Sequence, residues 1–343
     1  MKIAVPKEIE QFEKRVAASP ETVKKMVGAG LSVAIQTNAG RDSSMLDSEY
    51  QAAGAEIVSD AKTLLKDAAL VLKVQKPTLA EIDLLKEGSI LITHLQARTN
   101  PDLLTYLAKR KITAFSMDLM PRIARAQKMD SLSSQSNLAG YKAVLIAANR
   151  LKKIIPMMIT AAGTLTPAKV LVLGAGVAGL QAIATARRLG ALVEGFDTRP
   201  EVKEQVESLG AKFLTPELIQ QHVTEADIVI TTALIPGKPA PLLITEEAVR
   251  GMKEGSVIVD LAAETGGNCV LTEKGVEIVK HGVTLIGTLN IPSLVSTHAS
   301  QLYSKNIMNF LFEIYKKGQV GFNLEDPVIR ETLVTHEGKV VLK

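Results

Sequence analysis

Short apolar runs separated by amphipathic segments recur along the whole chain. In the first third, the β-rich runs lie at residues 1–6, 31–37, 69–75, 88–95 and 111–119. Between them, residues 19–30 and 100–111 combine N-capping residues with apolar side chains at helical spacing. Strands that alternate with helices are typical of a parallel sheet covered by helices, so the pattern predicts an α/β fold.

The central part of the chain repeats this pattern. Six further strand candidates lie at residues 168–179, 191–199, 211–215, 226–234, 255–262 and 283–290. The tetrapeptide Lys-Glu-Gly-Ser precedes an apolar run at both 86–89 and 253–256, which favours two related halves, although turn chemistry alone also explains the repeat. Helices are expected at residues 133–154 and 305–317.

We therefore predict two Rossmann-like, doubly wound parallel-sheet domains separated by a cleft. The first would comprise residues 1–132 completed by residues 305–343, and the second would comprise residues 133–304. A chain of 343 residues exceeds what one hydrophobic core comfortably supports, which agrees with two domains. Ligands of such folds bind in crevices at strand ends, so the cleft is the expected ligand site.

Composition and charge narrow the function classes. A net charge of +4 is too small to indicate a polyanionic partner, and 3% aromatic residues without Trp disfavour stacking on single-stranded nucleic acid. The longest apolar run, residues 170–186, is interrupted by glycines and is shorter than the roughly 20 residues of a membrane-spanning helix. The N-terminus lacks the apolar core of a signal peptide. The single cysteine points to a reducing compartment.

A dinucleotide-binding fingerprint begins at the strand that opens the second half. Gly174, Gly176 and Gly179 form G-x-G-x-x-G between an apolar strand and an Ala-rich helix that starts near Val177. These glycines permit a tight turn, backbone approach to a pyrophosphate and close packing of helix on strand. Free N–H groups at the helix N-terminus would hold the phosphates. A Gly-rich turn without a ligand is the alternative interpretation.

The next strand ends in a candidate ribose ligand. Asp197 lies 18 residues after Gly179 and would accept hydrogen bonds from the adenosine ribose while repelling a 2′-phosphate, which favours NAD over NADP. Thr198 and Arg199 follow it, and an arginine here is able to accommodate that phosphate. We give the carboxylate at the strand end more weight.

Two loops complete the set of candidates. Residues 231–241, read as TTALIPGKPAP, would offer backbone groups of Thr232, Ala233 and Leu234 to a ribose or nicotinamide, with a rigid surface loop as the alternative. Residues 121–134, read as PRIARAQKMDSLSS, are too polar for a core and form either a solvated connection or the edge of an active site.

Other reactive residue types indicate structure rather than chemistry. The five histidines show no metal-ligand spacing, so no metal site is predicted, and His94 is interpreted as structural. Cys269 is interpreted as a small buried residue, and Met157 and Met158 as core.

Five stretches resemble the NAD(H)-binding component of proton-translocating nicotinamide nucleotide transhydrogenases. They read MPRIARAQKMDSLSSQSNLAGYKAV, PMMITAAGTLTPAKVLVLGAGVAGLQAIATARRLGA, KEQVESLGAKF, TTALIPGKPAP and GSVIVDLAAETGGNC. The resemblance covers essentially the whole chain. It implies direct hydride exchange between NAD(H) on this component and NADP(H) on a separate partner, while a membrane-spanning third component carries protons. It also implies a cytoplasmic homodimer, peripheral on the inner face of the membrane.

The resemblance assigns roles to the polar loop. Arg122, Gln127, Asp130 and Ser133 match the family residues that hold the nicotinamide, ribose and phosphate region, with the glutamine reaching towards the partner's nucleotide. Hydride transfer between two nicotinamides needs no proton acceptor, so orientation and a fixed electrostatic environment are what the protein supplies.

Alanine dehydrogenase is the nearest competing family. It shares the two-half architecture and the pattern PKE…KRVAASPE, and Arg15 matches its arginine for the substrate carboxylate. Gln75 and Gln96 stand where that family has its substrate lysine and catalytic histidine, and Glu264 matches its cleft aspartate, a further candidate cofactor ligand here. Oxidative deamination needs proton-transferring groups, which two neutral glutamines do not provide.

A non-catalytic NAD-binding module that regulates a partner is the second alternative. It gains support from one departure from the transhydrogenase pattern. Family members carry a long mobile segment where this chain has only residues 216–225, PELIQQHVTE. A short helical link would not act as an extended lid.

Overall fold

The computed structural model describes residues 1–235, 237–316, 318–321 and 323–342. The chain divides into two compact units, one formed by Met1–Gln135 with Ser293–Lys343 and the other by Ser136–Pro292. This division differs from the sequence-based boundary at residue 304. Helix α11 (Ser296–Ile314) runs through that position without a break, and its buried side chains belong to the core of the first unit.

The first unit contains an eight-stranded sheet in the order β19-β18-β6-β5-β4-β1-β2-β3. Its strands are β1 (Lys2–Val5), β2 (Ser32–Gln36), β3 (Glu56–Val58), β4 (Leu70–Leu72), β5 (Ile90–Thr93), β6 (Thr113–Ser116), β18 (Leu333–His336) and β19 (Lys339–Val340). Strands β1 to β6 pair in parallel, while β18 pairs antiparallel with β6. The parallel order 3-2-1-4-5-6 is that of a doubly wound Rossmann fold.

Both faces of this sheet are buried. Ile3 and Val5 belong to one hydrophobic cluster and Ala4 to another, because successive strand residues point to opposite faces. The covering helices are α1 (Pro20–Gly28), α2 (Asp47–Ala52), α3 (Ala61–Lys66), α4 (Leu79–Leu84), α5 (Pro101–Lys109), α11 and α12 (Pro327–Thr332). Burial on both faces explains why the strands read as continuous apolar runs.

The second unit repeats the topology in a seven-stranded sheet, in the order β11-β10-β9-β12-β13-β15-β14. Its strands are β9 (Lys169–Leu173), β10 (Leu192–Phe196), β11 (Lys212–Phe213), β12 (Ile228–Thr231), β13 (Val257–Asp260), β14 (Glu277–Lys280) and β15 (Val283–Ile286). Only β14 runs antiparallel to its neighbour. The helices are α6 (Ser131–Arg150), which enters this unit at Ser136, α7 (Val177–Arg188), α8 (Lys203–Ser208), α9 (Ile219–Glu225) and α10 (Glu246–Gly251).

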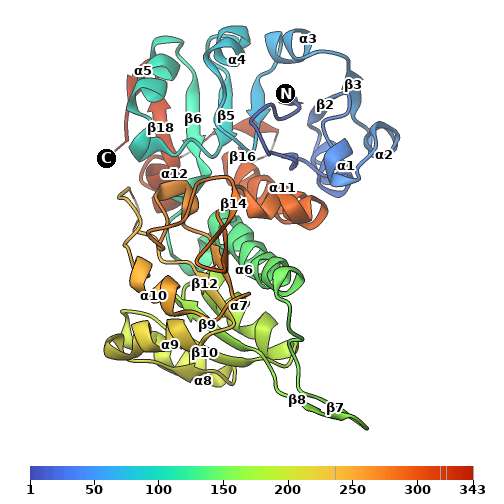
Figure 1. Ribbon diagram of the computed structural model, residues 1–343. Helices are drawn as coiled ribbons and strands as arrows, with labels where there is room; N and C mark the ends of the chain where they lie inside the picture. Colours follow the sequence, from blue (N-terminus) through green and yellow to red (C-terminus); the bar gives the residue numbers. More distant parts are fainter. Residues whose placement is uncertain (236, 317, 322, 343) are drawn as a thin grey trace. The chain divides into compact units, whose positions relative to one another are not determined.

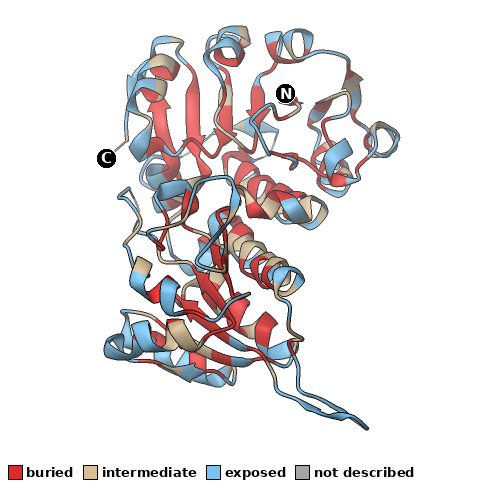
Figure 2. Ribbon diagram, viewed as in Figure 1, coloured by how far each residue is buried: buried red, intermediate tan, exposed pale blue. Residues whose placement is uncertain are grey.

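The predicted α/β class and parallel sheets are confirmed. All eleven predicted strands are present, whereas β3, β14, β18 and β19 are short strands that the pattern did not reveal. The predicted helix at 133–154 is α6 (Ser131–Arg150), and the one at 305–317 is the second half of α11; residue 317 lies outside the described residues. Figure 1 shows both sheets and their helices, and Figure 2 shows the central strands of each sheet buried.

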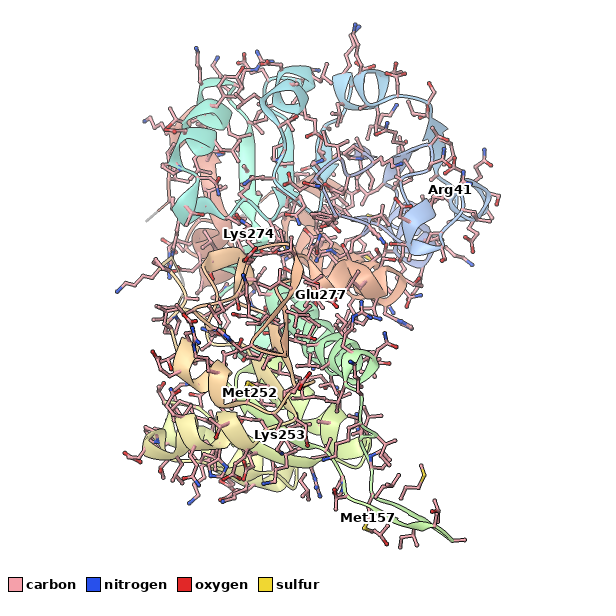
Figure 3. The ribbon with its side chains drawn as sticks, in the orientation of Figure 1. Arg41, Met157, Met252, Lys253, Lys274 and Glu277 are labelled. Carbon is pink, nitrogen blue, oxygen red and sulfur yellow. The ribbon has the colours of Figure 1, made fainter. Side chains whose placement is uncertain are left out.

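A hairpin of β7 (Met158–Thr160) and β8 (Gly163–Leu165) projects from the second unit (Figure 1). All six strand residues are exposed, and Met157 at its base is labelled in Figure 3. The prediction that Met157 and Met158 are core is wrong, since they are 59% and 44% exposed. Strands β7 and β8 pair only with each other in a two-stranded sheet, so their side chains are not covered by a second layer.

The described part of the chain contains no helix that is both long and apolar enough to cross a membrane.

Helices α6 and α7 approach each other closely at a glycine in the second unit. A Cβ atom added at Gly140 would overlap the carbonyl of Ala178, whose backbone cannot yield easily within α7. We expect Gly140→Ala to lower the free energy of unfolding by about 1–3 kcal/mol through overpacking. Chemical denaturation measures this. Gly28→Ala is the control, because nothing lies within 4 Å of a Cβ there. Equal stability of the two variants would contradict the expectation.

Candidate functional site

The order of strands in the second unit reverses between β9 and β12. These two strands are adjacent and parallel, and the chain continues from them to opposite sides of the sheet order. Doubly wound sheets bind ligands at the carboxyl ends of the strands where this reversal occurs. Gly174 directly follows β9 and Thr232 directly follows β12, so both predicted candidates lie at this edge.

The glycine turn has the geometry that its sequence predicts. Gly174 has a φ of +101°, and a Cβ atom there would lie 2.5 Å from the Thr232 hydroxyl oxygen. A Cβ at Gly179 would overlap the carbonyl oxygen of Gly174, whereas one at Gly176 would meet nothing within 4 Å. Helix α7 begins at Val177, and its N-cap provides no side-chain hydrogen bond. The first amides of α7 therefore remain available beside open space, an arrangement suited to a phosphate.

Asp197 follows β10 and accepts hydrogen bonds with both carboxylate oxygens. The Ala175 amide donates to Oδ2 at 2.7 Å, and the Arg199 amide donates to Oδ1 at 2.9 Å. The Arg199 guanidinium donates to both oxygens at 3.0 Å. Burial opposes ionisation, but these hydrogen bonds outweigh it and lower the pKa of Asp197. Thr198, between them, is exposed and Asp197 itself is half-buried.

The loop after β12 is held from within by Asn268. The Asn268 amide nitrogen donates to the carbonyls of Ala233 and Pro241 at 2.9 and 2.8 Å, and its oxygen accepts from the Ala233 amide at 3.0 Å. The Thr232 hydroxyl donates to the Gly174 carbonyl at 3.0 Å, which joins the two turns. Leu234 remains 55% exposed at the tip. Pro236 of the predicted loop lies outside the described residues.

Asn268 is in turn positioned by a buried carboxylate at the end of β13. Asp260 is fully buried and accepts from the amides of Ala262, Asn268 and Cys269 and from the Thr272 hydroxyl, at 2.7 to 3.1 Å. Sequence reasoning missed Asp260 and Asn268. The available signal was an aspartate that ends a fully apolar strand, shortly before Gly-Gly-Asn.

The remaining candidates of the second unit have structural partners. Exposed Glu264 accepts a hydrogen bond from the Asn290 amide at 3.0 Å. Cys269 is buried as predicted, and burial raises the pKa of its thiol. The described residues contain no cluster of His, Cys, Asp and Glu side chains able to hold a metal ion.

The polar loop of the first unit forms a 3-10 helix, η4 (Ala124–Met129), that is anchored from behind. Ala126 and Met129 are fully buried in the core of that unit. Asn306 and Asn309 of α11 both donate to the Lys128 carbonyl, at 3.0 and 3.1 Å. The ammonium group of Lys128 pairs with Glu313 at 3.4 Å, and Arg125 pairs with Glu313 and Asp326. The predicted polar residues are therefore presented on a fixed backbone.

The four predicted residues of this loop fall into two pairs. Asp130 and Ser133 are brought together: the Ser133 amide and hydroxyl donate to the Asp130 carboxylate at 2.9 and 2.5 Å. This contact caps the start of α6. Arg122 and Gln127 are exposed, and their side chains have no hydrogen bond or ion pair with any described residue. They are the groups of the loop that remain free to meet a ligand.

The strand order of the first unit reverses between β1 and β4, and charged side chains fill that edge. Lys73 is 2% exposed and pairs with Glu81 at 2.7 Å and Glu8 at 3.3 Å. The Arg15 guanidinium donates twice to Glu13, at 2.8 and 2.6 Å. Of these charged residues, sequence reasoning singled out only Arg15.

Neutral amides complete the cluster. Arg15 also donates to the Gln135 side-chain oxygen at 2.9 Å, and the Gln75 amide donates to Glu13 at 2.8 Å. Although burial opposes it, hydrogen bonding and the charge of Arg15 lower the pKa of Glu13 to about 2. Each buried cation is thus paired with carboxylates of the chain itself.

His94 has the structural role that the sequence indicated. Its Nε2 lies 2.7 Å from the Ser131 hydroxyl, and its ring packs edge-on against Tyr303. Burial lowers the pKa of His94 to about 4, so the imidazole is neutral near pH 7.

Removing the Asn268 side chain should loosen the loop after β12. Asn268→Ala deletes three hydrogen bonds of a fully buried amide, so we expect the free energy of unfolding to fall by about 2–4 kcal/mol. Hydrogen exchange should quicken in peptides from residues 233–243. Gln205→Ala, an exposed site on α8, should change neither quantity. Unaltered protection of residues 233–243 in Asn268→Ala would refute this positioning role.

Known proteins share this architecture over the full chain. Family models described as the N-terminal and C-terminal domains of alanine dehydrogenase/PNT match residues 4–139 and 143–343. The first portion of NAD(P) transhydrogenase subunit alpha from Rhodospirillum rubrum is 51% identical over 375 residues, which covers 99% of this chain and 98% of that protein.

Solved structures agree. A transhydrogenase from Sinorhizobium meliloti matches with a TM-score of 0.93 at 46% identity, covering 100% of this chain and 99% of that one. An L-alanine dehydrogenase matches with a TM-score of 0.88 at 29% identity, covering 100% and 97%. The chain therefore belongs to the alanine dehydrogenase/PNT family.

Proposed function

We propose that this chain is the NAD(H)-binding component of a proton-translocating transhydrogenase. In this proposal, hydride passes directly between NAD(H) bound here and NADP(H) bound on a partner component, and a membrane-spanning component couples the exchange to proton movement. The observation that carries it is 51% identity, over the full chain, to a transhydrogenase alpha subunit. The chain would act in the cytoplasm, peripheral on the inner face of the membrane.

The residues at the edge of the second unit fit a dinucleotide. The uncapped amides from Val177 onward lie beside the open space at Gly176 and would hold the pyrophosphate. Asp197 would accept the adenosine ribose hydroxyls, next to Thr198 and Arg199. Of the loop candidates, Ala233 has its amide and carbonyl engaged by Asn268, so the Thr232 carbonyl and the Leu234 backbone would meet the second ribose or the nicotinamide while Ala233 fixes the loop. Glu264 would support this side through Asn290.

The polar loop would orient the reactive end of the nucleotide. When bound, NAD(H) supplies or accepts the hydride at its nicotinamide ring. Arg122 would hold a phosphate, and exposed Gln127 would address a carboxamide or ribose without adding a charge. The carboxylate of Asp130, already fixed by Ser133, would accept a ribose hydroxyl. None of these residues needs to transfer a proton, which agrees with direct hydride exchange.

The alanine dehydrogenase alternative lacks support at its proton-transferring positions. The Gln75 amide is held by Glu13, and Gln96 is an exposed neutral amide. We expect no alanine-dependent formation of NADH by the isolated chain. Such activity would overturn the proposal in favour of an amino-acid dehydrogenase.

Reconstitution with the NADP(H)-binding component tests the proposed function and the polar loop together. Gln127→Ala and Asp130→Asn should each slow hydride exchange from NADPH to an NAD analogue by about 10- to 100-fold, because orientation is lost. Both variants should still bind NADH. The exposed glutamine Gln51 provides the matched control as Gln51→Ala. Unchanged exchange with intact binding in the loop variants would favour a non-catalytic NAD-binding module.

The exposed hairpin fits the proposed homodimer. Met157, Met158, Ile159 and Leu165 present large apolar side chains that are 44% to 72% exposed on one small projection. Met158 and Leu165 pair across the hairpin on one face, and Ile159 lies on the other face. Exposed large apolar side chains gathered on one projection are typical of a protein interface, and a second copy of the chain is the occupant that the proposed homodimer supplies.

A charge on the hairpin should therefore separate the two copies. Ile159 is 72% exposed, and Ile159→Asp would place a carboxylate in the apolar contact. We expect light scattering to report the dimer mass for the wild type and the monomer mass for this variant. Leu79→Asp, at a 54% exposed leucine in the first turn of α4, should remain a dimer. A dimeric Ile159→Asp variant would exclude the hairpin as the interface.

A further inference from the structure

The ribose-binding carboxylate of the proposed nucleotide site is already saturated by the chain itself. A carboxylate offers about four acceptor positions. At Asp197, two are taken by the backbone amides of Ala175 and Arg199, and two by the guanidinium of Arg199. A ribose with free hydroxyls finds no vacant acceptor position on Asp197 in this arrangement.

The two kinds of donor differ in how easily they leave. The Ala175 amide is part of the glycine turn, and the Arg199 amide is fixed because Pro200 restricts the residue before it to an extended conformation. The Arg199 side chain, by contrast, is 47% exposed, whereas that of Asp197 is 9% exposed. Arrival of a ribose would therefore displace the guanidinium and leave both backbone hydrogen bonds in place.

We propose that Arg199 is a specificity-determining residue: it reduces the preference of this site for NAD(H) over NADP(H). The inference rests on the proposed binding of the adenosine ribose at Asp197. Arg199 competes with the ribose hydroxyls for the carboxylate and so weakens NAD(H) binding. Its positive charge also offsets the negative charge of Asp197, which would repel a 2′-phosphate. Once displaced from Asp197, the guanidinium is able to pair with that phosphate.

Both effects lower the preference for NAD(H), so removing the side chain should raise it. We expect Arg199→Ala to increase the ratio of the NADPH to the NADH dissociation constant by about two- to fivefold, the scale of a partly exposed ion pair. Arg199→Lys keeps the charge but loses the bidentate hydrogen bonds to Asp197. Its ratio of dissociation constants should therefore lie between those of Arg199→Ala and the wild type.

The experiment measures both dissociation constants on the full-length chain, using the fluorescence of the reduced nicotinamide. Lys203→Ala is the matched control, since Lys203 is an exposed cation four residues along that is paired with Glu207; its ratio should equal that of the wild type. A ratio in Arg199→Ala that stays constant or falls would overturn the proposal. A fall would mean that Arg199 holds the bound NAD(H) rather than competing with it.

Asp197→Asn separates this inference from the function on which it rests. If Asp197→Asn weakens NADH binding while Arg199→Ala leaves the ratio unchanged, only the role of Arg199 fails. If Asp197→Asn affects neither nucleotide, the ribose does not bind at Asp197, and both the placement of the nucleotide and this inference fail. The reconstituted hydride exchange remains an independent test of the function.

Discussion

The parallel pairing of β9 with β12 determines where the second unit is able to bind a ligand. Because the chain continues from these strands in opposite directions, a crevice is expected at their carboxyl ends. The ends of β9, β10, β12 and β13 carry, in order, a glycine turn, Asp197, the Thr232 loop and Asp260. In the proposed function the first three would bind the nucleotide, and hydrogen bonds join them: the Ala175 amide of the turn donates to Asp197, and the Thr232 hydroxyl donates to the Gly174 carbonyl. Asp260 positions Asn268, and Asn268 fixes the loop that begins at Thr232.

The same topology leads to a different outcome in the first unit. There the reversal edge is filled by buried charges, in which Lys73 pairs with Glu8 and Glu81, and Arg15 pairs with Glu13. Breaking one buried pair would leave an unpaired charge at a cost of about 3–5 kcal/mol. The same strand order, present twice in one chain, thus has free helix amides at one reversal edge and paired charged side chains at the other. The topology sets the location, and the side chains at the strand ends decide whether it is available.

Sequence reasoning succeeded where local patterns are strong. The long apolar runs predicted the parallel strands, and the glycine spacing located the turn after β9, since both depend on contacts within a few residues. It failed where the outcome depends on distant partners. From the sequence, Met157 and Met158 are interpreted as core because apolar side chains usually are, and only the structure shows that they lie exposed on the hairpin. The roles of Asp260 and Asn268 also depend on contacts between separate loops, which no single segment encodes.

In the proposed function, the polar loop would orient the nucleotide without the help of a lid. The link of residues 216–225 is a 3-10 turn followed by the short helix α9, and it is tied to β10 where His222 meets Glu194 at 2.6 Å. A segment pinned in this way is unsuited to a large closing motion. Orientation must then come from elements that are already rigid. Asn306 and Asn309 of α11 hold the backbone of η4 at the Lys128 carbonyl, and Glu313 on the same helix pairs with the Lys128 ammonium group. In the proposed function, Arg122 and Gln127 would then need to settle only their own side chains. Hydride transfer requires accurate placement of two nicotinamide rings and needs no proton relay. A backbone that is already fixed before binding would therefore accelerate the transfer by holding one ring in place.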